Sequence, residues 1–359
     1  MIFFLGNIYK DDFLKKNNKL SPATTAWLNN FIKKLKLKVK ILSFYYQPFF
    51  PFGKFYVNEN NFSIFKNTIY LNYINLPLLR TKIIEKKILE ELTKYKKKKI
   101  TLITYNFSPI IFSILKKINR KKVNWISICA DYDNKNQKEI FKKIKNSNIN
   151  IFLSKVSYDA YKYKNKLFFN GFQNQSIIKK KIIKIKNFLY SGSLENWTGI
   201  KYFLDDFISY KNKKIKLIIT SNSNQLNIKK YLKDKRIKFL GFLKNKDYQK
   251  KLIKSDCFVN LRNSNDLNNQ NNFPSKLLQY TPHCKPIIST NLENIDKKLK
   301  RILIYNKKNN YLELIKYVSN LDANNLNKIS NKTHNYNKKK KKEEIEFIKK
   351  INKLIKYVS

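Results

Sequence analysis

Three of the six glycines stand where a phosphate group could approach the backbone. Gly6, Gly192 and Gly241 each follow a short apolar run that is predicted as a β-strand. In parallel α/β domains, ligands bind outside the carboxyl ends of the strands, and a residue without a side chain lets the backbone come close to a phosphate. The chain has no GxGxxG pattern and no Walker A loop, which excludes a standard dinucleotide fingerprint and a P-loop.

Histidine, cysteine and serine chemistry find little support in the sequence. His283 and His334 are the only histidines, too few for a histidine metal cluster, so no metal cofactor is expected. The three cysteines are an odd number without CxxC spacing, which excludes a disulfide framework and is typical of a reducing compartment. A GxSxG nucleophile motif is absent.

Short apolar runs rich in β-forming residues alternate with amphipathic stretches along the whole chain. In the first half, a helix is predicted to begin at Ser21-Pro22, with serine as the N-cap and proline at the first position. Further helices are predicted at 79–95, 109–117 and 137–145, strands at 2–5, 39–44, 100–105, 123–128 and 150–153, and a long loop at 47–61.

The second half repeats this alternation. Strands are predicted at 187–190, 215–220, 237–240, 257–261, 286–289 and 302–305, and helices at 200–209, 228–232, 247–253, 274–280 and 312–318. Such alternation indicates parallel sheets covered by helices, here as two Rossmann-like domains. We place the first domain at 1–165, a linker at 166–186 around the turn signal Asn170-Gly171, and the second domain at 187–335.

The final segment, 342–358, has apolar residues at three- and four-residue spacing, including Ile348, Ile351 and Ile355. This stripe predicts a helix that crosses back to pack on the first domain. Two alternatives stay open at this stage: a helix that closes the second domain, and a basic amphipathic helix that lies on a membrane.

Four segments in fixed order carry a resemblance to a known family. They read YSGSLENWTG at 190–199, IKFLGF at 237–242, SDCFVNLR at 255–262 and NNFPSKLLQYTPHCKPIIST at 271–290. Together they resemble the donor-binding domain of retaining GT-B glycosyltransferases, a family that includes many bacterial polysaccharide glycosyltransferases. The resemblance implies an α/β protein with the GT-B fold, in which two Rossmann-like domains with parallel sheets face a cleft.

It also implies a donor site for a nucleotide-diphosphate sugar, built mostly on the second domain. Arg262 follows a predicted strand and Lys276 begins the helix opened by Pro274, so two cations and a helix N-terminus could hold the diphosphate and stabilise its charge as it departs, without a metal. The other donor-binding candidates are Gly192, Ser193, Gly241, Phe273, Ser275 and Gln279.

The first half resembles the family more loosely. Ser21 and Thr24 lie in a small-residue cluster that matches a loop facing the donor phosphate and the acceptor. Asp131 and Asp133 follow the strand at 123–128 and could form a carboxylate pair or stabilise the loop. Because Asp131 stands nearer to the strand end, it is the better candidate for a catalytic role in orienting the acceptor hydroxyl.

Three positions depart from the family pattern. Gln279 stands where a glutamate commonly accepts hydrogen bonds from ribose, so Gln279→Glu is expected to bind the donor at least as well. Cys284 stands in a turn where glycine is usual, at a cost of about 1–2 kcal/mol if the turn requires positive φ. Neither arginine nor lysine occurs at 193–198, where many relatives carry both.

The charge has a simple explanation in codon usage. Lys and Arg total 76 against 24 Asp and Glu, a net charge of +52, yet only five of the cations are arginine, while 49 residues are asparagine. An A/T-rich genome fills unconstrained surface with Lys and Asn, and a phosphate reader would favour Arg, so no nucleic-acid partner is expected. We expect the charge to be spread over the surface, and membrane binding to be weak and salt-sensitive.

The sequence therefore predicts a retaining glycosyltransferase that moves a sugar from a nucleotide-diphosphate donor to a hydroxyl of a glycan or lipid-linked acceptor. No signal peptide or membrane-spanning run is evident, so a cytoplasmic location is expected, with weak association at the inner face of the membrane left open. Two rivals remain: a degenerate, non-catalytic GT-B protein that acts as a binding partner, and a nucleic-acid binder driven by charge.

Overall fold

The computed structural model describes residues 1–359 apart from 18–19, 96, 107–108, 119–121, 132–135, 174, 222–225, 263–270, 307 and 359. The chain forms two compact units. The first comprises Met1–Phe13, Thr24–Asn170 and Ile345–Ser359, and the second comprises Leu14–Ala23 and Gly171–Glu344. The strand Lys166–Phe168 still belongs to the first sheet. The predicted linker of 166–186 therefore begins too early, and the units divide between Asn170 and Gly171.

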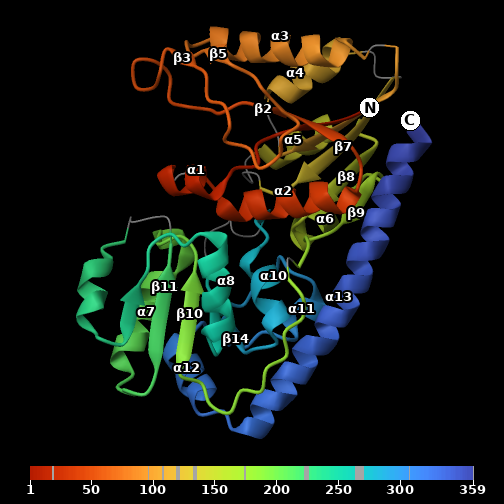
Figure 1. Ribbon diagram of the computed structural model, residues 1–359. Coiled ribbons are helices and arrows are strands. Elements are labelled where there is room, and N and C mark those ends of the chain that lie inside the picture. Colours follow the sequence, from red (N-terminus) through yellow and green to blue (C-terminus); the bar gives the residue numbers. More distant parts are fainter. Residues whose placement is uncertain are drawn as a thin grey trace. The chain divides into compact units, whose positions relative to one another are not determined.

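Seven parallel strands form the sheet of the first unit (Figure 1). They are β1 (Ile2–Leu5), β2 (Val39–Ser43), β4 (Thr68–Tyr70), β6 (Ile100–Tyr105), β7 (Val123–Cys129), β8 (Ile149–Phe152) and β9 (Lys166–Phe168), in the order β4-β2-β1-β6-β7-β8-β9. Phe3 and Phe4 are both buried, although successive side chains of a strand point to opposite faces. Both faces of the sheet are therefore covered, as expected of a parallel sheet.

Helices and one small two-stranded sheet complete the part of the chain up to Asn170. They are α1 (Asp11–Lys16), α2 (Pro22–Leu35), α3 (Leu79–Thr93), α4 (Pro109–Lys117), α5 (Gln137–Ile144) and α6 (Lys155–Ala160), with β3 (Tyr56–Val57) pairing antiparallel to β5 (Tyr73–Ile74). Ile84 and Ile88 of α3 and Ile114 of α4 pack in one buried cluster with Phe3 and Leu102 of the sheet. The segment 47–61, predicted as a loop, includes the short strand β3.

The sheet of the second unit has five parallel strands. They are β10 (Asn187–Ser191), β11 (Lys216–Thr220), β12 (Ile237–Phe239), β13 (Cys257–Asn260) and β14 (Ile287–Ser289), in the order β12-β11-β10-β13-β14. The helical segments are η3 (Asn196–Thr198), α7 (Ile200–Ser209), η4 (Ile228–Lys233), α8 (Asn245–Lys254), α10 (Lys276–Tyr280), η5 (Thr281–His283), α11 (Lys297–Lys300) and α12 (Tyr311–Ser319).

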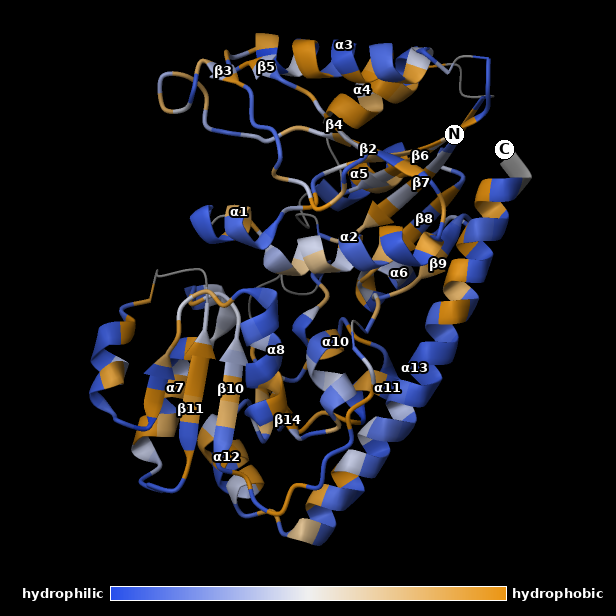
Figure 2. Ribbon diagram, in the orientation of Figure 1, coloured by the Kyte–Doolittle hydropathy of each residue, from blue (hydrophilic) through white to orange (hydrophobic). Residues whose placement is uncertain are grey.

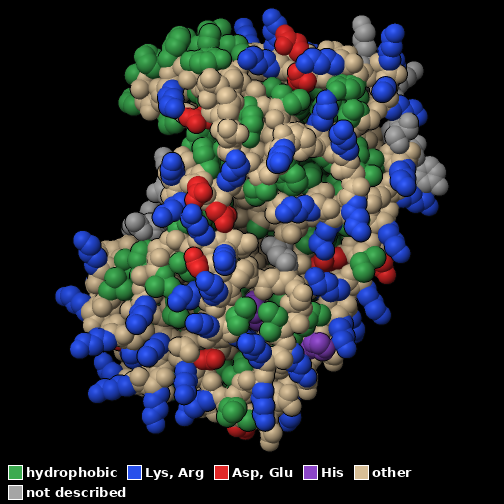
Figure 3. All heavy atoms as spheres, viewed as in Figure 1, with side chains coloured by type: hydrophobic (Ala, Val, Ile, Leu, Met, Phe, Trp, Pro, Cys, Tyr) green, Lys and Arg blue, Asp and Glu red, His purple; other side chains and the backbone are tan. Residues whose placement is uncertain are grey.

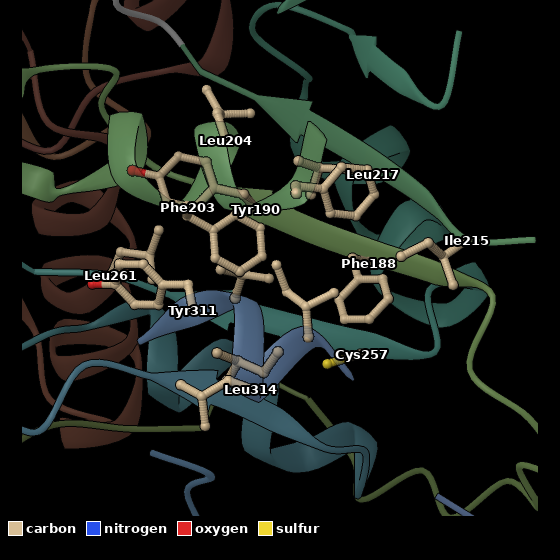
Figure 4. Close-up of a cluster of buried hydrophobic side chains, with 14 of the residues drawn as sticks. Phe188, Tyr190, Phe203, Leu204, Ile215, Leu217, Cys257, Leu261, Tyr311 and Leu314 are labelled. Carbon is tan, nitrogen blue, oxygen red and sulfur yellow. The ribbon is translucent and has the colours of Figure 1, made fainter. Parts of the chain in front are cut away.

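One buried cluster joins this sheet to the helices α7 and α12. Figure 4 shows Phe188 and Tyr190 of β10 and Leu217 of β11 lying with Phe203 of α7 and Leu314 of α12. Cys257 belongs to the same cluster and is fully buried, as expected for a strand residue. The cluster fixes the strand positions, and through them the loops at the carboxyl edge of the sheet.

The last helix, α13 (Ala323–Val358), is longer than the predicted segment of 342–358. Figure 2 shows hydrophobic and hydrophilic bands alternating along it. From Ile345 it belongs to the first unit, where Phe347 stacks on Phe169 with ring centroids 3.7 Å apart. Asn124 of β7 also donates a hydrogen bond of 3.2 Å to the carbonyl of Leu354. Ile351 is buried here, so the stripe is not free to lie on a membrane, as the second of the two alternatives would require.

Two isoleucines of α13 provide a matched test of this packing. Ile351 is 0% exposed and Ile345 is 57% exposed. Ile351→Val is expected to lower the free energy of unfolding by about 1 kcal/mol, because it deletes one buried methylene. Ile345→Val should change it by less than about 0.5 kcal/mol. Urea unfolding measures both, and equal effects would show that the stripe is not packed.

Two predicted elements differ in kind from those in the structure. The run 302–305, predicted as a strand, forms only an isolated bridge between Ile304 and Ile288. Its residues Ile302 and Leu303 are buried, so side-chain packing rather than strand pairing explains their apolar character. The helix predicted at 228–232 is the 3-10 helix η4. Short apolar runs leave such assignments ambiguous in a sequence.

Cationic side chains are scattered over the face seen in Figure 3 rather than gathered into one groove. Within the described part of the chain, no helix is both long and apolar enough to cross a membrane.

Candidate functional site

The candidate residues of the second unit gather at the carboxyl edge of its sheet. In the order β12-β11-β10-β13-β14, β11 and β12 are added on one side of β10 and the later strands on the other, so the order of strand addition reverses between β10 and β13. These two parallel strands lie side by side, with Tyr190 paired to Val259. Gly192 and Ser193 follow β10, and Arg262 follows β13. In open α/β sheets, ligands bind in the crevice outside the strand ends at this reversal. The topology therefore puts Arg262 and the loop of Gly192 at the preferred ligand position.

Gly192 and Gly241, the two glycines at strand ends of the second unit, are explained by different physical constraints. A Cβ at Gly192 would lie 2.9 Å from Tyr190 Oη, whose hydroxyl donates to the carbonyl of Ser193 at 2.6 Å, so close packing explains this glycine. Gly241 has φ of +62° and its Cβ position is open, so the left-handed backbone explains it. Its carbonyl accepts a hydrogen bond of 2.9 Å from Thr220 at the end of β11. Both glycines shape the edge of the sheet.

Arg262 lies where the sequence placed it, directly beyond β13. Its backbone N–H donates to Thr290 Oγ1 at 2.9 Å, which ties it to the end of β14. Its guanidinium lies 4.7 Å from the ring centre of Trp197, a cation–π contact that orients the side chain. Trp197 in turn donates its indole N–H to Glu195. The sequence offers an ion pair with Asp266 as an alternative role for Arg262, but Asp266 lies outside the described residues.

Lys276 is a cation that no described carboxylate neutralises through an ion pair. Its Nζ lies 3.3 Å from Gln279 Oε1 and 4.8 Å from the ring centre of Tyr248. Desolvation of its ammonium group lowers the pKa of Lys276 to about 8. Removing a charge from water costs free energy unless an oppositely charged or hydrogen-bonding partner stabilises it. An anion at this position would restore the pKa and stabilise the charge.

Gln279 is held by two donors. Its Oε1 accepts the hydroxyl of Tyr248 at 3.0 Å in addition to Lys276. The next residue of α10, Tyr280, accepts the N–H of Ser191 on its hydroxyl at 3.1 Å, beside Gly192. These contacts fix α10 to the end of β10. They bring Lys276, Gln279 and the loop of Gly192 to the same edge.

The remaining donor-binding candidates contribute less clearly. Phe273 is buried, and Ser275 stands at the N-cap of α10 without a side-chain capping bond. Ser193 Oγ is buried and has no hydrogen-bond partner among the described residues. Because α10 has only five residues, its dipole is weaker than the helix predicted at 274–280 would supply. The charge of Lys276 itself therefore carries the anion-binding argument.

The segment after α10 is structural. Cys284 has φ of +53°, which shows that this turn does require the left-handed backbone. Lys285 is buried, and its Nζ donates to the carbonyls of Ile253 at 2.8 Å, Leu252 at 3.3 Å and Ser255, at the end of α8. Lys285 thus caps a helix, whose last carbonyls otherwise lack donors.

In the first unit, the candidates lie near strand ends. Asp131 is exposed and follows β7, and Asn106 Oδ1 accepts the N–H groups of Ala130 and Asp131 at 2.9 and 3.1 Å. Ser21 is exposed just before α2 and belongs to the second unit, not to the first domain where the sequence placed it. Burial raises the pKa of Tyr105, and a hydrogen bond with Thr24 partly offsets that rise. Asp133 lies outside the described residues.

Sequence reasoning missed three contributors: Trp197, Tyr248 and Asn106. The WTG sequence around Trp197 was noted only as part of the family resemblance, and nothing near Tyr248 marks it. Asn106 has φ of +56°, a conformation that Asn tolerates better than most residues, but its sequence neighbours gave no turn signal. Among the described residues, no group of three or more His, Cys, Asp or Glu could hold a metal ion.

Neither a protein-family model nor a curated protein matches the sequence. Solved structures match the fold. The pneumococcal O-GlcNAc transferase GtfA, in complex with UDP and GlcNAc, matches with a TM-score of 0.64 at 9% identity over 100% of this chain and 99% of that one. The trehalose-6-phosphate synthase OtsA matches with a TM-score of 0.62 at 8% identity over 97% of this chain and 98% of that one.

TarM of S. aureus, in complex with Fondaparinux, alpha-GlcNAc-glycerol and UDP, matches with a TM-score of 0.56 at 14% identity. The match covers 78% of this chain and 59% of TarM, so the chain spans less than two thirds of that relative's length. These identities are too low to carry an activity across. They show that the chain has the GT-B fold of glycosyltransferases, with a parallel α/β sheet in each unit.

Proposed function

We propose that the chain transfers a sugar from a nucleoside-diphosphate sugar to a hydroxyl of a glycan or lipid-linked acceptor, with retention at the anomeric carbon. The main supporting observation is geometric: Lys276 is a partly buried cation without a described carboxylate partner, at the start of α10 and at the sheet edge that also presents Arg262. GT-B neighbours with UDP or UDP-sugars support the donor class.

In this proposal, bond cleavage places negative charge on the departing diphosphate, and Arg262 and Lys276 stabilise that charge. Trp197 holds the guanidinium of Arg262 in place. Because two side-chain cations meet the diphosphate, the reaction requires no metal. Asp131 orients the acceptor hydroxyl as a hydrogen-bond acceptor.

The test combines binding and turnover. Calorimetry with UDP at fixed salt is expected to show binding, and a UDP-sugar with an acceptor series is expected to release UDP. Asp131→Asn should retain UDP binding while losing turnover. Failure of the wild type to bind any nucleoside diphosphate would overturn the proposal.

A non-catalytic nucleotide-binding protein is the second candidate, and one observation favours it. Gln279 Oε1 is already occupied by Tyr248 and Lys276, so it is not free to accept the ribose hydroxyls that a glutamate would hold in the family. UDP binding without turnover on any acceptor would support this candidate.

The affinity for UDP is expected to fall above pH 8. Lys276 is charged below its pKa of about 8, and a bound diphosphate raises that pKa. Between the free and bound pKa values, binding takes up one proton, so affinity decreases by up to about tenfold per pH unit. The terminal phosphate adds no change there, because its second pKa is about 6. Calorimetry from pH 7 to 10 measures the slope, and a flat profile would contradict this role of Lys276.

Gln279→Glu is now expected to weaken UDP binding at pH 7.5, contrary to the expectation from the family pattern alone. A carboxylate at this position would pair with Lys276, raise its pKa and supply the negative charge that the diphosphate would otherwise supply. We expect a loss of roughly three- to tenfold, and a decline with pH that starts above pH 8. Tighter binding would instead place residue 279 at the ribose.

A further inference from the structure

Half of the exposed large apolar side chains among the described residues belong to one part of the first unit. Eight of the sixteen lie at 46–56 and 78–79. We call this set the aromatic patch: Tyr46, Phe49, Phe50, Phe52, Phe55, Tyr56, Leu78 and Leu79. Phe52 is 90% exposed and Leu78 is 82% exposed. Figure 3 shows hydrophobic side chains gathered at the upper left, over the segment of β3 and the start of α3. Exposed apolar clusters of this kind mark interaction surfaces.

The backbone beneath the patch is fixed by buried polar contacts. Arg80 lies 3.8 Å from the ring centre of Phe49 and 4.8 Å from that of Tyr46, and donates to the carbonyl of Gln47 at 2.8 Å. Asn75 is buried and donates to the carbonyls of Pro48 at 2.6 Å and Lys54 at 3.0 Å. The loop therefore holds its aromatic residues outward in a defined arrangement, which a loop without a partner would not need.

Cations surround the patch. Between residues 46 and 87 there are six Lys or Arg and two Asp or Glu, a local net charge of +4. Lys54 lies within the patch but forms an ion pair with Glu59 at 2.7 Å, so the cations most available to a partner are Lys82 and Lys86, which are exposed on α3. Aromatic and leucine side chains beside lysines are the composition of segments that insert at the surface of an anionic bilayer.

The positive charge also indicates which partner covers the aromatic patch, an anionic bilayer or a second copy of the chain. Two copies joined through this patch would bring two positive surfaces together, on a chain that carries +52 overall. An anionic lipid surface is attracted by the same charges, and its headgroup region accepts Phe and Tyr rings without a shaped pocket. The observations thus favour lipid over self-association.

We propose that the aromatic patch docks the first unit on anionic lipid bilayers, with Phe50 and Phe52 inserted at the headgroup boundary and the lysines on the anionic headgroups. This inference does not rest on the proposed sugar transfer, because lipid binding is measured without donor or acceptor. If sugar transfer fails its own test, the docking surface stands or falls separately.

The test uses the full chain and vesicles of 70% phosphatidylcholine and 30% phosphatidylglycerol. Wild type is expected to co-sediment with them at low salt and to bind more weakly at high salt. Phe50→Ser with Phe52→Ser should lower the partition coefficient at least tenfold. The control pair Tyr202→Ser with Tyr317→Ser removes two aromatic residues of the second unit that are 62% and 57% exposed, and should bind like wild type.

A probe at the tip reports insertion directly. The three native cysteines are buried, so Phe52→Cys offers one accessible thiol for a polarity-sensitive dye. Its emission should shift to the blue on adding these vesicles. Unchanged emission, vesicle binding that survives the double serine substitution, or no binding of wild type at low salt would each overturn the proposal. A concentration-dependent dimer that the serine substitutions abolish would also overturn it.

Discussion

Replacing Lys276 with methionine is expected to weaken UDP binding roughly 10- to 150-fold, the equivalent of about 1.5–3 kcal/mol for a hydrogen bond to a charged group. Methionine keeps the length and apolar contacts of the lysine chain but removes the charge. The ammonium group is desolvated, so an anion beside it interacts strongly. Calorimetry with UDP at pH 7.5 and constant salt measures the change.

The same substitution should leave the free energy of unfolding unchanged or slightly higher. In the free protein, Lys276 Nζ lies 3.3 Å from Gln279 Oε1 and 4.8 Å from the ring centre of Tyr248. It forms no ion pair with a described carboxylate. These contacts compensate the partial burial of the ammonium group less than an ion pair would, so the charge is a net cost to folding. A residue that lowers stability while it improves binding is typical of a functional site.

Lys285 provides a matched control nine residues further along the chain. Burial also lowers its pKa to about 8, but its Nζ donates to the carbonyls at the end of α8. Lys285→Met leaves those buried carbonyls without their donor, so we expect a loss of roughly 2–3 kcal/mol in unfolding free energy. The affinity of Lys285→Met for UDP should stay within about twofold of wild type, because the ammonium group of Lys285 binds the carbonyls at the end of α8 rather than a ligand.

Lys276→Met should therefore lower UDP affinity without lowering stability, and Lys285→Met should lower stability without lowering UDP affinity. If Lys276→Met bound UDP like wild type, the site at this edge of the sheet would be wrong. If Lys276→Met lost as much stability as Lys285→Met, the lowered affinity would report damage to the fold instead of a lost contact. Urea unfolding of both variants beside the calorimetry distinguishes these outcomes.

Much of the site followed from residue order and strand ends, but its internal contacts did not. Arg262 and Lys276 could be singled out because one ends a strand and the other opens a helix in a segment that resembles a known family. The engagement of Gln279 by Tyr248 could not be foreseen, because α8 and α10 meet only through the folded chain. Trp197 likewise depends on how η3 turns toward β13.

The fold was predictable where apolar runs were long and regularly spaced. Strands β1 and β6 and helices α4 and α7 have the predicted bounds. Short edge strands such as β4 and β9 were missed, because three residues carry too little pattern to distinguish them from loops. At 302–305 the opposite error occurred: a strand was predicted, but the apolar residues there are buried without forming a paired strand.

Acid should destabilise the protein through His283, by roughly 3 kcal/mol between pH 6.5 and 4. The ring is fully buried beside Phe258, with ring centroids 5.6 Å apart, and neither ring nitrogen has a partner among the described residues. Burial, and next the positive charge of Lys285, lowers the pKa of His283 to about 4. The ordinary pKa of about 6.5 applies in the unfolded chain.

The sign follows from proton binding. Between pH 6.5 and 4 the unfolded chain binds a proton at this histidine and the folded protein does not, so the free energy of unfolding falls as the pH falls. The contribution of His283 to the free energy of unfolding is fully present well above pH 6.5. It decreases by about 1.4 kcal/mol per pH unit as the pH falls from 6.5 to 4. Urea unfolding at steps of half a pH unit measures this slope.

His283→Phe isolates the contribution of this one group. Phenylalanine keeps a ring of similar shape in the buried position and cannot be protonated, so the acid slope of the variant should be smaller by about 1.4 kcal/mol per unit. Its stability at pH 7 should not fall, because the two ring nitrogens that lack described partners are removed with the imidazole. A slope in His283→Phe equal to that of wild type would mean that the imidazole is already protonated in the folded protein near pH 6.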